Sequence, residues 1–308
     1  MRLLPLLLLF SLTVHGQKAG NTPFIVILGN VQDAGSPHPG CKKDCCRDLF
    51  LHPDPERKIT ALGIVDPVSG KSFLIEATPD IALQMKNLQR HLPSMGREIP
   101  DGILVTHAHI GHYTGLMYLG REGLNTKNVP VFVMPRMHDF LAKNGPWSQL
   151  VSLGNIDMRP LNEGIAVELS GQLKITPFRV PHRDEYSETI GIRIEGPEKK
   201  ALFIPDIDKW DRWKIDIIQA IAEVDYAIID GTFYDAQELG GRDMAEIPHP
   251  FMVESMELFR KLPDPERNKI WFIHLNHTNP ALNPKSPQSK TIRKNGFHIA
   301  RINQILEL

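Results

Sequence analysis

The sequence has no excess of charge of either sign. Its 308 residues carry 35 Lys and Arg against 36 Asp and Glu, so the formal net charge is −1. Proteins that bind nucleic acid or an anionic membrane through a broad electrostatic field carry a clear basic excess. We therefore expect no nucleic-acid partner, and the substrate we expect is a small molecule.

The sequence also lacks an apolar run of the ~20 residues that a membrane-spanning helix needs. The run at residues 3–12 has the length of a signal peptide, follows Arg2, and precedes the small residues Val14 and Gly16. A buried N-terminal helix is the alternative, but Pro5 interrupts it. We expect residues 1–16 to be a signal peptide of an exported protein, periplasmic or secreted, and residues 17–308 to form one domain.

Cysteine is scarce and clustered. The three cysteines, Cys41, Cys45 and Cys46, fall within six positions. An odd number so close together is a poor disulfide framework, because adjacent cysteines pair only with strain. A metal site that takes one more ligand from elsewhere in the chain explains the cluster better than free thiols do.

No glycine-rich phosphate loop follows any expected strand. Short apolar, β-branched runs bounded by Gly, Pro and Asp predict strands near residues 24–28, 61–65, 73–76, 102–106, 131–134, 173–180, 190–194, 201–204, 226–229 and 270–273. Helical patterns intervene at residues 79–91, 137–143, 214–224 and 251–262. Strand-rich halves that each contain helices predict an α/β fold of the helix–sheet–sheet–helix (αββα) sandwich type.

Three histidines follow the strand expected near residues 102–105. Alternate residues of an extended segment face the same way, so His107 and His109 can hold one ion from one side. His112 lies on the turn into a helix expected over residues 113–119. Neutral imidazoles bind zinc and other first-row metals. A lone histidine would be an ordinary core or surface residue, but three in six positions predict a metal centre.

This segment resembles the metallo-β-lactamase superfamily, whose hallmark is His-x-His-x-Asp-His after a core strand. The rest of that pattern follows in order along the chain. The resemblance implies that His182 completes a first site with His107 and His109, and that Asp206 bridges two metals. It also implies that His274 belongs with His112 to a second site.

Gly111 breaks the pattern, because the superfamily carries an aspartate at this position. The second site would then retain only His112, His274 and Asp206. Two outcomes are open: an enzyme with one metal, or one with two metals and an altered second site. We expect one tightly held metal and a second that is loose or absent.

The resemblance narrows to the protein B family of pyrroloquinoline quinone (PQQ) biosynthesis. It rests on Val31-Gln32-Asp33-Ala34-Gly35, on the cysteine cluster, on Asp230-Gly231-Thr232-Phe233-Tyr234 and on the segment from Phe272 to Pro280. His249 falls where that family has a histidine near the active site, although a loop histidine without a role explains it equally well. The resemblance implies that biosynthetic members have lost the first histidine pair, which this chain keeps. This difference and the export signal indicate a paralogue with more hydrolase-like chemistry.

The cysteine cluster also resembles that of a phosphodiesterase branch of the superfamily. In that branch three cysteines of an early loop and a histidine three residues after the last active-site histidine hold a structural zinc. The resemblance implies a closed site of Cys41, Cys45, Cys46 and His277, which would pin the early loop to the C-terminal half. Adjacent cysteines rarely bind one tetrahedral ion without distortion, so we expect one of Cys45 and Cys46 to be a spectator.

Together these patterns predict a metal-dependent hydrolase of an ester, phosphoester, lactone or amide. Metal at the first site would lower the pKa of a bound water toward ~7 and so supply hydroxide. Asp206 would orient the hydroxide or accept its proton, and His112 or His274 would assist the leaving group. We expect zinc, as one or two catalytic ions and one structural ion. Two alternatives are an iron-dependent oxidative enzyme like the PQQ family, and a non-catalytic metal-binding relative.

Overall fold

The computed structural model describes residues 20–92 and 96–308. The expected signal peptide, residues 1–16, lies outside the described residues. No helix in these two ranges has both the length and the apolar character that crossing a bilayer requires.

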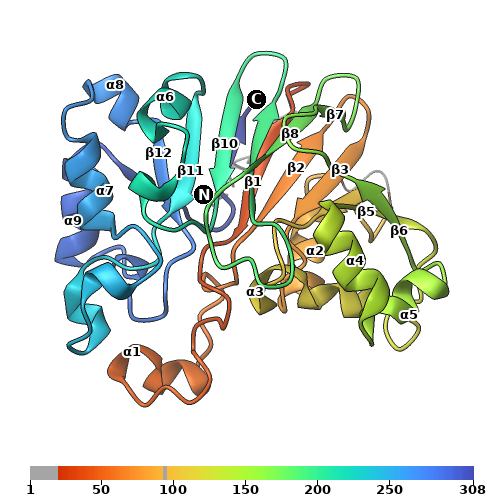
Figure 1. Cartoon of the computed structure of the whole chain (residues 1–308), viewed down its shortest axis with the longest axis horizontal. Helices are drawn as coiled ribbons and strands as arrows, with labels where there is room; N and C mark the ends of the chain where they lie inside the picture. The colour runs from red at the N-terminus through yellow and green to blue at the C-terminus, as the bar shows by residue number, and fades with distance from the viewer. Residues whose placement is uncertain (1–19, 93–95) are drawn as a thin grey trace, which may run out of the picture.

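The described residues build two mixed seven-stranded sheets that pack face to face (Figure 1). The first sheet has the spatial order β14 (Ile305–Glu307), β1 (Phe24–Gly29), β2 (Ala61–Asp66), β3 (Lys71–Ile75), β4 (Gly102–Leu104), β5 (Val129–Val133) and β6 (Ile156–Pro160). The second has the order β13 (His298–Ile299), β12 (Ile270–Ile273), β11 (Tyr226–Asp230), β10 (Lys200–Ile204), β9 (Ile190–Glu195), β8 (Lys174–Arg179) and β7 (Val167–Glu168).

Helices cover the outer face of each sheet, which confirms the predicted αββα sandwich (Figure 1). The first sheet carries α2 (Ile81–Gln89), α3 (Ile110–Tyr113), α4 (Pro135–Lys143) and α5 (Trp147–Ser152). The second carries α6 (Ile217–Ala222), α7 (Met252–Phe259) and α9 (Pro287–Lys294), while the short α8 (Asp264–Arg267) buries none of its residues. The helix expected over residues 113–119 is instead the short α3 followed by the 3₁₀ helix η3 (Thr114–Leu119).

Strand β1 shows why the sandwich forms from this sequence. Its residues Ile25 and Ile27 face the space between the sheets, where they join a core with Ile192 of β9. The alternate residue Val26 faces the other way and packs in the cluster under α2. Side chains on a strand alternate between faces, so a strand buried on both faces reads as a continuous apolar run.

The chain segments that leave several strands meet at one edge of the sandwich. Strands β3, β4 and β5 pair in parallel, and so do β10, β11, β12 and β13. The carboxyl ends of parallel strands lie at the same edge of a sheet, which is where open α/β sheets bind ligands. The predicted metal ligands follow these ends.

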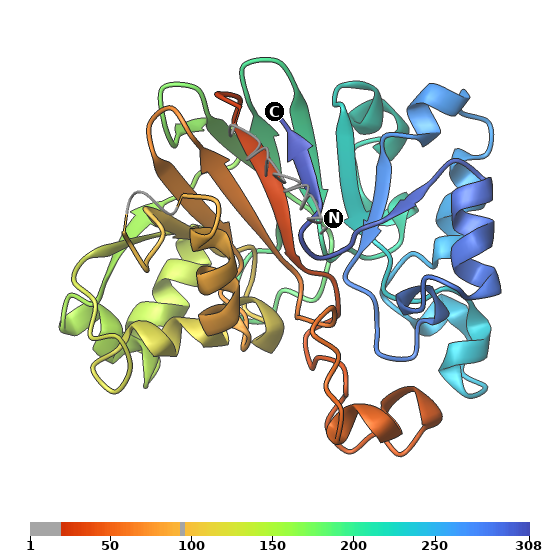
Figure 2. The ribbon, with the colours of Figure 1, turned by 180° about the vertical axis from the view of Figure 1, so that it is seen from behind.

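One segment leaves the sandwich at this edge. Residues 36–58, with α1 (Asp44–Arg47) and the 3₁₀ helix η1 (Asp48–Phe50), extend away from both sheets (Figures 1 and 2). The flanking residues Val31 and Ile59 belong to the hydrophobic core of the second sheet. None of the residues between them, all of which the structure describes, belongs to a hydrophobic core cluster.

Candidate metal centre

The structure brings together the four residues predicted for the first site. His107 Nε2 lies 2.9 Å from His109 Nδ1 and 3.4 Å from Asp206 Oδ2, and His182 Nε2 lies 3.1 Å from the same Asp206 oxygen. One donor atom of each residue lies within 4.8 Å of the others. Ligands about 2 Å from a tetrahedral ion are separated by distances of this order. The group therefore fits a single zinc-like ion.

Contacts outside this group fix the direction of two imidazoles. His107 Nδ1 lies 2.9 Å from Thr106 Oγ1, and His182 Nδ1 lies 3.3 Å from Asp208 Oδ1. An outer hydrogen bond of this kind selects the tautomer and orients the ring of a metal-binding histidine. Both rings thus present Nε2 to the centre. Within the described residues, His182 Nε2 is buried and faces Asp206 Oδ2 without completing a hydrogen bond to it, as expected of an atom that binds a cation.

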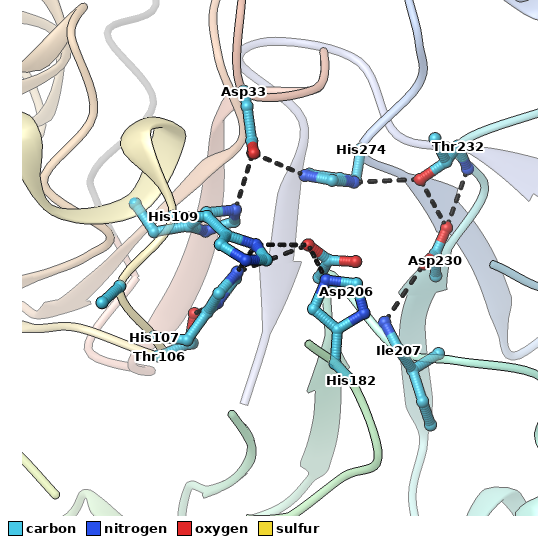
Figure 3. A network of polar contacts seen from close by, with 12 residues as sticks. Asp33, Thr106, His107, His109, His182, Asp206, Ile207, Asp230, Thr232 and His274 are labelled. Atoms are coloured by element: carbon cyan, nitrogen blue, oxygen red, sulfur yellow. Dashed lines mark hydrogen bonds and ion pairs between the residues drawn. The ribbon is translucent and has the colours of Figure 1, made fainter. Parts of the chain in front are cut away.

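The second group of candidate ligands includes a residue that the sequence did not predict. His112, His274 and Asp206 gather as expected, and Asp33 joins them. Asp33 Oδ1 lies 2.9 Å from His112 Nε2. The same oxygen lies 3.2 Å from His274 Nε2 (Figure 3). The structure thus places a fourth candidate ligand, a carboxylate from the loop after β1, beside the three residues expected with Gly111. Asp33 stands within a sequence motif that marked the family resemblance, but nothing in its spacing pointed to this contact.

Contacts to their Nδ1 atoms also orient His112 and His274, the two histidines of the second site. His112 Nδ1 lies 3.1 Å from Glu76 Oε1, and His274 Nδ1 lies 3.0 Å from Thr232 Oγ1. Glu76 and His274 both adopt a positive φ, 78° and 64°. Such backbone costs about 1–3 kcal/mol for a residue other than glycine and persists where the surrounding structure fixes it, often at functional sites. The conformation turns both side chains toward the centre at the ends of β3 and β12.

The electrostatics of this centre favour bound positive charge. Burial opposes the charge of Asp206, but His182 and His249 hold its pKa well below the ordinary value. Burial likewise opposes the charge of His182, but Asp206 raises its pKa to about 10. Buried carboxylates of this kind are stable only beside cations, and a metal ion can replace the protons that the imidazoles otherwise carry. The donor set therefore suits the ion that the fold implies.

His249 lies at the centre as well. Its Nδ1 is 2.9 Å from Asp230 Oδ2 and 3.3 Å from Asp206 Oδ1, and the side chain is buried. The three residues form another group of close donor atoms. Of the two explanations left open by the sequence, the structure thus places His249 beside the metal ligands.

The four residues expected to hold a structural zinc also come together. Cys45 Sγ lies 4.0 Å from Cys41 Sγ and 3.9 Å from Cys46 Sγ, and a ring nitrogen of His277 is within 4.8 Å of all three sulfurs. Burial, with His38 and Lys43 nearby, lowers the pKa of His277 to about 4, so its imidazole is neutral and able to bind metal. Both adjacent cysteines reach the group, so the geometry singles out neither as a spectator.

Glu238 provides a prediction about pH. It lies on the 3₁₀ helix η5 (Ala236–Leu239), accepts hydrogen bonds from Tyr234 N and Thr278 Oγ1, and burial raises its pKa to about 7. The folded chain therefore holds this proton more tightly than the unfolded chain, and stability falls as the pH rises from about 4.5 to about 7. Glu238→Gln should flatten this dependence in urea unfolding at pH 5 and pH 8. The exposed Glu168→Gln is the control, and an unchanged slope in Glu238→Gln would contradict the prediction.

Comparisons with known proteins agree with this architecture. The beta-lactamase superfamily domain model matches residues 71–275. The chain is 27% identical over 305 residues to the coenzyme PQQ synthesis protein B of Pseudomonas fluorescens, covering 88% of this chain and 96% of that protein. The structure of Zn²⁺-bound PqqB from Methylobacterium extorquens superposes with a TM-score of 0.74 at 22% identity, covering 92% of this chain and 100% of that one. A diphosphatase from the PhnP family gives 0.62 at 20% identity, with 93% and 97% covered.

Proposed function

This chain belongs to the beta-lactamase superfamily, as its histidine motif predicted, and on that premise we propose that it is a metal-dependent hydrolase of phosphoesters. The observation that carries the proposal is the position of Asp206 between two four-residue groups of metal-binding side chains. Paired metal sites that share a ligand are typical of enzymes that cleave phosphoesters, because two ions stabilise the attacking and the leaving oxygens together. The fold likeness to a diphosphatase supports a substrate that carries a phosphoryl group.

We assign separate catalytic roles to the metal ligands and to the two oxygens of Asp206. Metal at these ligands would activate water as the nucleophile and polarise the phosphoryl oxygen. Asp206 directs Oδ2 toward the first-site histidines, so this oxygen can accept the proton of the attacking water. The other oxygen of Asp206, Oδ1, contacts His249 Nδ1. The Asp206 carboxylate therefore lies between the first-site histidines and the His249 imidazole.

His249 is a better proton donor for the leaving group than His112 or His274, which the sequence favoured. Both ring nitrogens of His112 lie against Asp33 and Glu76, and those of His274 lie against Asp33 and Thr232. Among the described residues, the polar contacts of the His249 ring with Asp230 and Asp206 are both made by Nδ1, and we propose that Nε2 faces the substrate. We therefore assign His112 and His274 to metal binding, and His249 to the leaving oxygen.

A cavity of about 790 Å³ lies beside the chain segments that carry Asp208 and His249, and its volume suits a small-molecule substrate. Its walls include Lys209 and Pro250, the residues that directly follow Asp208 and His249. The apolar side chains Trp213 and Met244 contribute to the same wall. None of the candidate metal ligands, which all lie in the described ranges, lines this cavity, so it could contact only a part of the substrate remote from the phosphoryl group.

His249→Gln tests the role of the proton donor. A general acid contributes about 10²- to 10⁴-fold, and it matters most when the leaving alcohol is a poor one. We expect kcat of the variant to fall about a hundredfold or more for an alkyl phosphodiester, and far less for a p-nitrophenyl phosphodiester. The exposed His138→Gln is the matched control. An equal loss for both leaving groups would contradict the assignment.

The function itself is tested by loading the protein with Zn²⁺ or Mn²⁺ and assaying phosphodiesters, phosphomonoesters, lactones and carboxyl esters side by side. We expect the highest kcat/KM on a phosphoester. Turnover confined to lactones or carboxyl esters would reject the substrate class, and no turnover in metal-loaded protein would favour a non-catalytic role.

A second candidate is an oxidative role like that of the PQQ synthesis relatives. It is favoured by the extent of the likeness, which covers 88% of this chain. This role predicts iron in protein purified without chelators and oxygen consumption during turnover. Elemental analysis and an oxygen electrode distinguish it from hydrolysis.

A further inference from the structure

We propose that Asp33 takes the place of the aspartate that the superfamily carries at position 111, as the carboxylate ligand of a second metal ion. The carboxylate has moved from the segment after β4 to the loop after β1. The inference rests on one part of the proposed function, the binding of a second metal ion beside His112 and His274.

The first support is that the two positions compete for the same space. A Cβ atom added to Gly111 would lie 2.5 Å from Asp33 Cα and 2.5 Å from Asp33 Oδ1. Real Cβ atoms essentially never approach backbone so closely, so a side chain at 111 and the present position of Asp33 exclude each other. Asp33 therefore fills the volume that an aspartate at 111 would need.

The second support is that Asp33 offers one atom to both histidines. Asp33 Oδ1 contacts His112 Nε2 and His274 Nε2, at 2.9 and 3.2 Å. The Nδ1 atoms of the two rings face Glu76 and Thr232, so the Nε2 atoms are the ones presented for metal binding. Two imidazole nitrogens and a carboxylate oxygen at this spacing, with Asp206 nearby, are the ligands expected around one ion.

The third support is that backbone pairing fixes Asp33 relative to His274. Val31 forms a parallel bridge with Leu275, Gln32 N donates to Leu275 O at 2.9 Å, and Leu275 N donates to Asn30 O at 2.8 Å. These bonds place the loop after β1 directly beside the residue that follows His274. The ligand thus comes from a rigid part of the fold rather than from a free loop.

The test counts ions with Mn²⁺, because imidazole and carboxylate ligands accept Mn²⁺ while the thiolate cluster favours zinc. Mn²⁺ titration followed by electron paramagnetic resonance should show two bound ions in the wild type, with a spin-coupled spectrum because Asp206 lies between them. In Asp33→Ala and in the isosteric Asp33→Asn, the Kd of the second ion should rise at least about tenfold and the coupled signal should be lost. The Kd of the first ion should change little.

A double variant makes the test specific to this position. Gly111→Asp alone should bind the second ion poorly, because its side chain clashes with Asp33. Adding Asp33→Gly should restore the coupled signal. Asp184→Ala, on the exposed loop after His182, is the matched control. A second ion that binds Asp33→Asn as tightly as the wild type would overturn the inference, and so would a single bound ion in an active wild type. Two coupled ions lost with Asp33 in a protein without phosphoesterase activity would support the inference while rejecting the proposed function.

Discussion

Asp206→Asn will reduce kcat/KM on the best phosphoester on the order of a thousandfold, since it removes one charged group that serves both sites. One carboxylate oxygen of Asp206 faces the first-site histidines, and the other faces His249. The asparagine amide has the shape of the aspartate carboxylate but lacks its charge. Its NH₂ group would face either the first-site histidines, where the oxygen is a candidate metal ligand, or His249, which needs an acceptor. Elemental analysis of the same preparation should show loss of at least one ion.

Asp208→Asn is the matched control for this prediction. Asp208 lies on the same loop and contacts His182 Nδ1 at 3.3 Å, but it has no place in either group of ligand atoms. Losing the orienting contact should cost about 10- to 100-fold in metal affinity or activity. If Asp206→Asn keeps both ions and more than a tenth of wild-type activity, Asp206 does not bridge the sites.

The sandwich could be predicted from sequence because each strand carries its own signal. The apolar run of β1 predicts a strand buried on both faces, and the core shows Ile25 and Val26 on opposite faces. Helix boundaries were less predictable. The polar contacts of His112 with Asp33 and Glu76 fix its ring within α3. The expected helix is therefore the four-residue α3, and the 3₁₀ helix η3 follows it.

His107, His109, His182 and His274 could be predicted because each closely follows a strand, where the resemblance to the superfamily motif gives its role. Asp33 could not, because its partners His112 and His274 lie 79 and 241 residues away in the chain. Nothing near Asp33 in sequence records this pairing. The sequence shows glycine at position 111 where the superfamily carries an aspartate. The position of Asp33 in its place depends on the backbone bridge between Val31 and Leu275, which appears only in the fold.

The extended segment at residues 36–58 leads to the second large effect. It contributes to no hydrophobic core cluster of the described chain, so metal at Cys41, Cys45, Cys46 and His277 is the main tie we expect between it and the body. Where a core is missing, metal binding supplies the folding free energy. Cys46→Ser or His277→Ala should therefore lose one zinc per chain and speed proteolytic cleavage within residues 36–58 at least about a hundredfold.

His38→Gln is the matched control for the zinc tie, since the His38 ring lies 4.4 Å from that of His277 and belongs to neither group of ligands. It should keep the zinc and the resistance to protease. Comparing Cys45→Ser with Cys46→Ser then decides whether either cysteine is a spectator, because a spectator variant keeps its zinc. If Cys45→Ser, Cys46→Ser and His277→Ala all keep both zinc and resistance, the cluster is not a metal site. Asp33 lies three residues before this segment, and His274 lies three residues before His277. Loss of the zinc at the cysteine cluster should therefore also weaken binding of the second catalytic ion before the first.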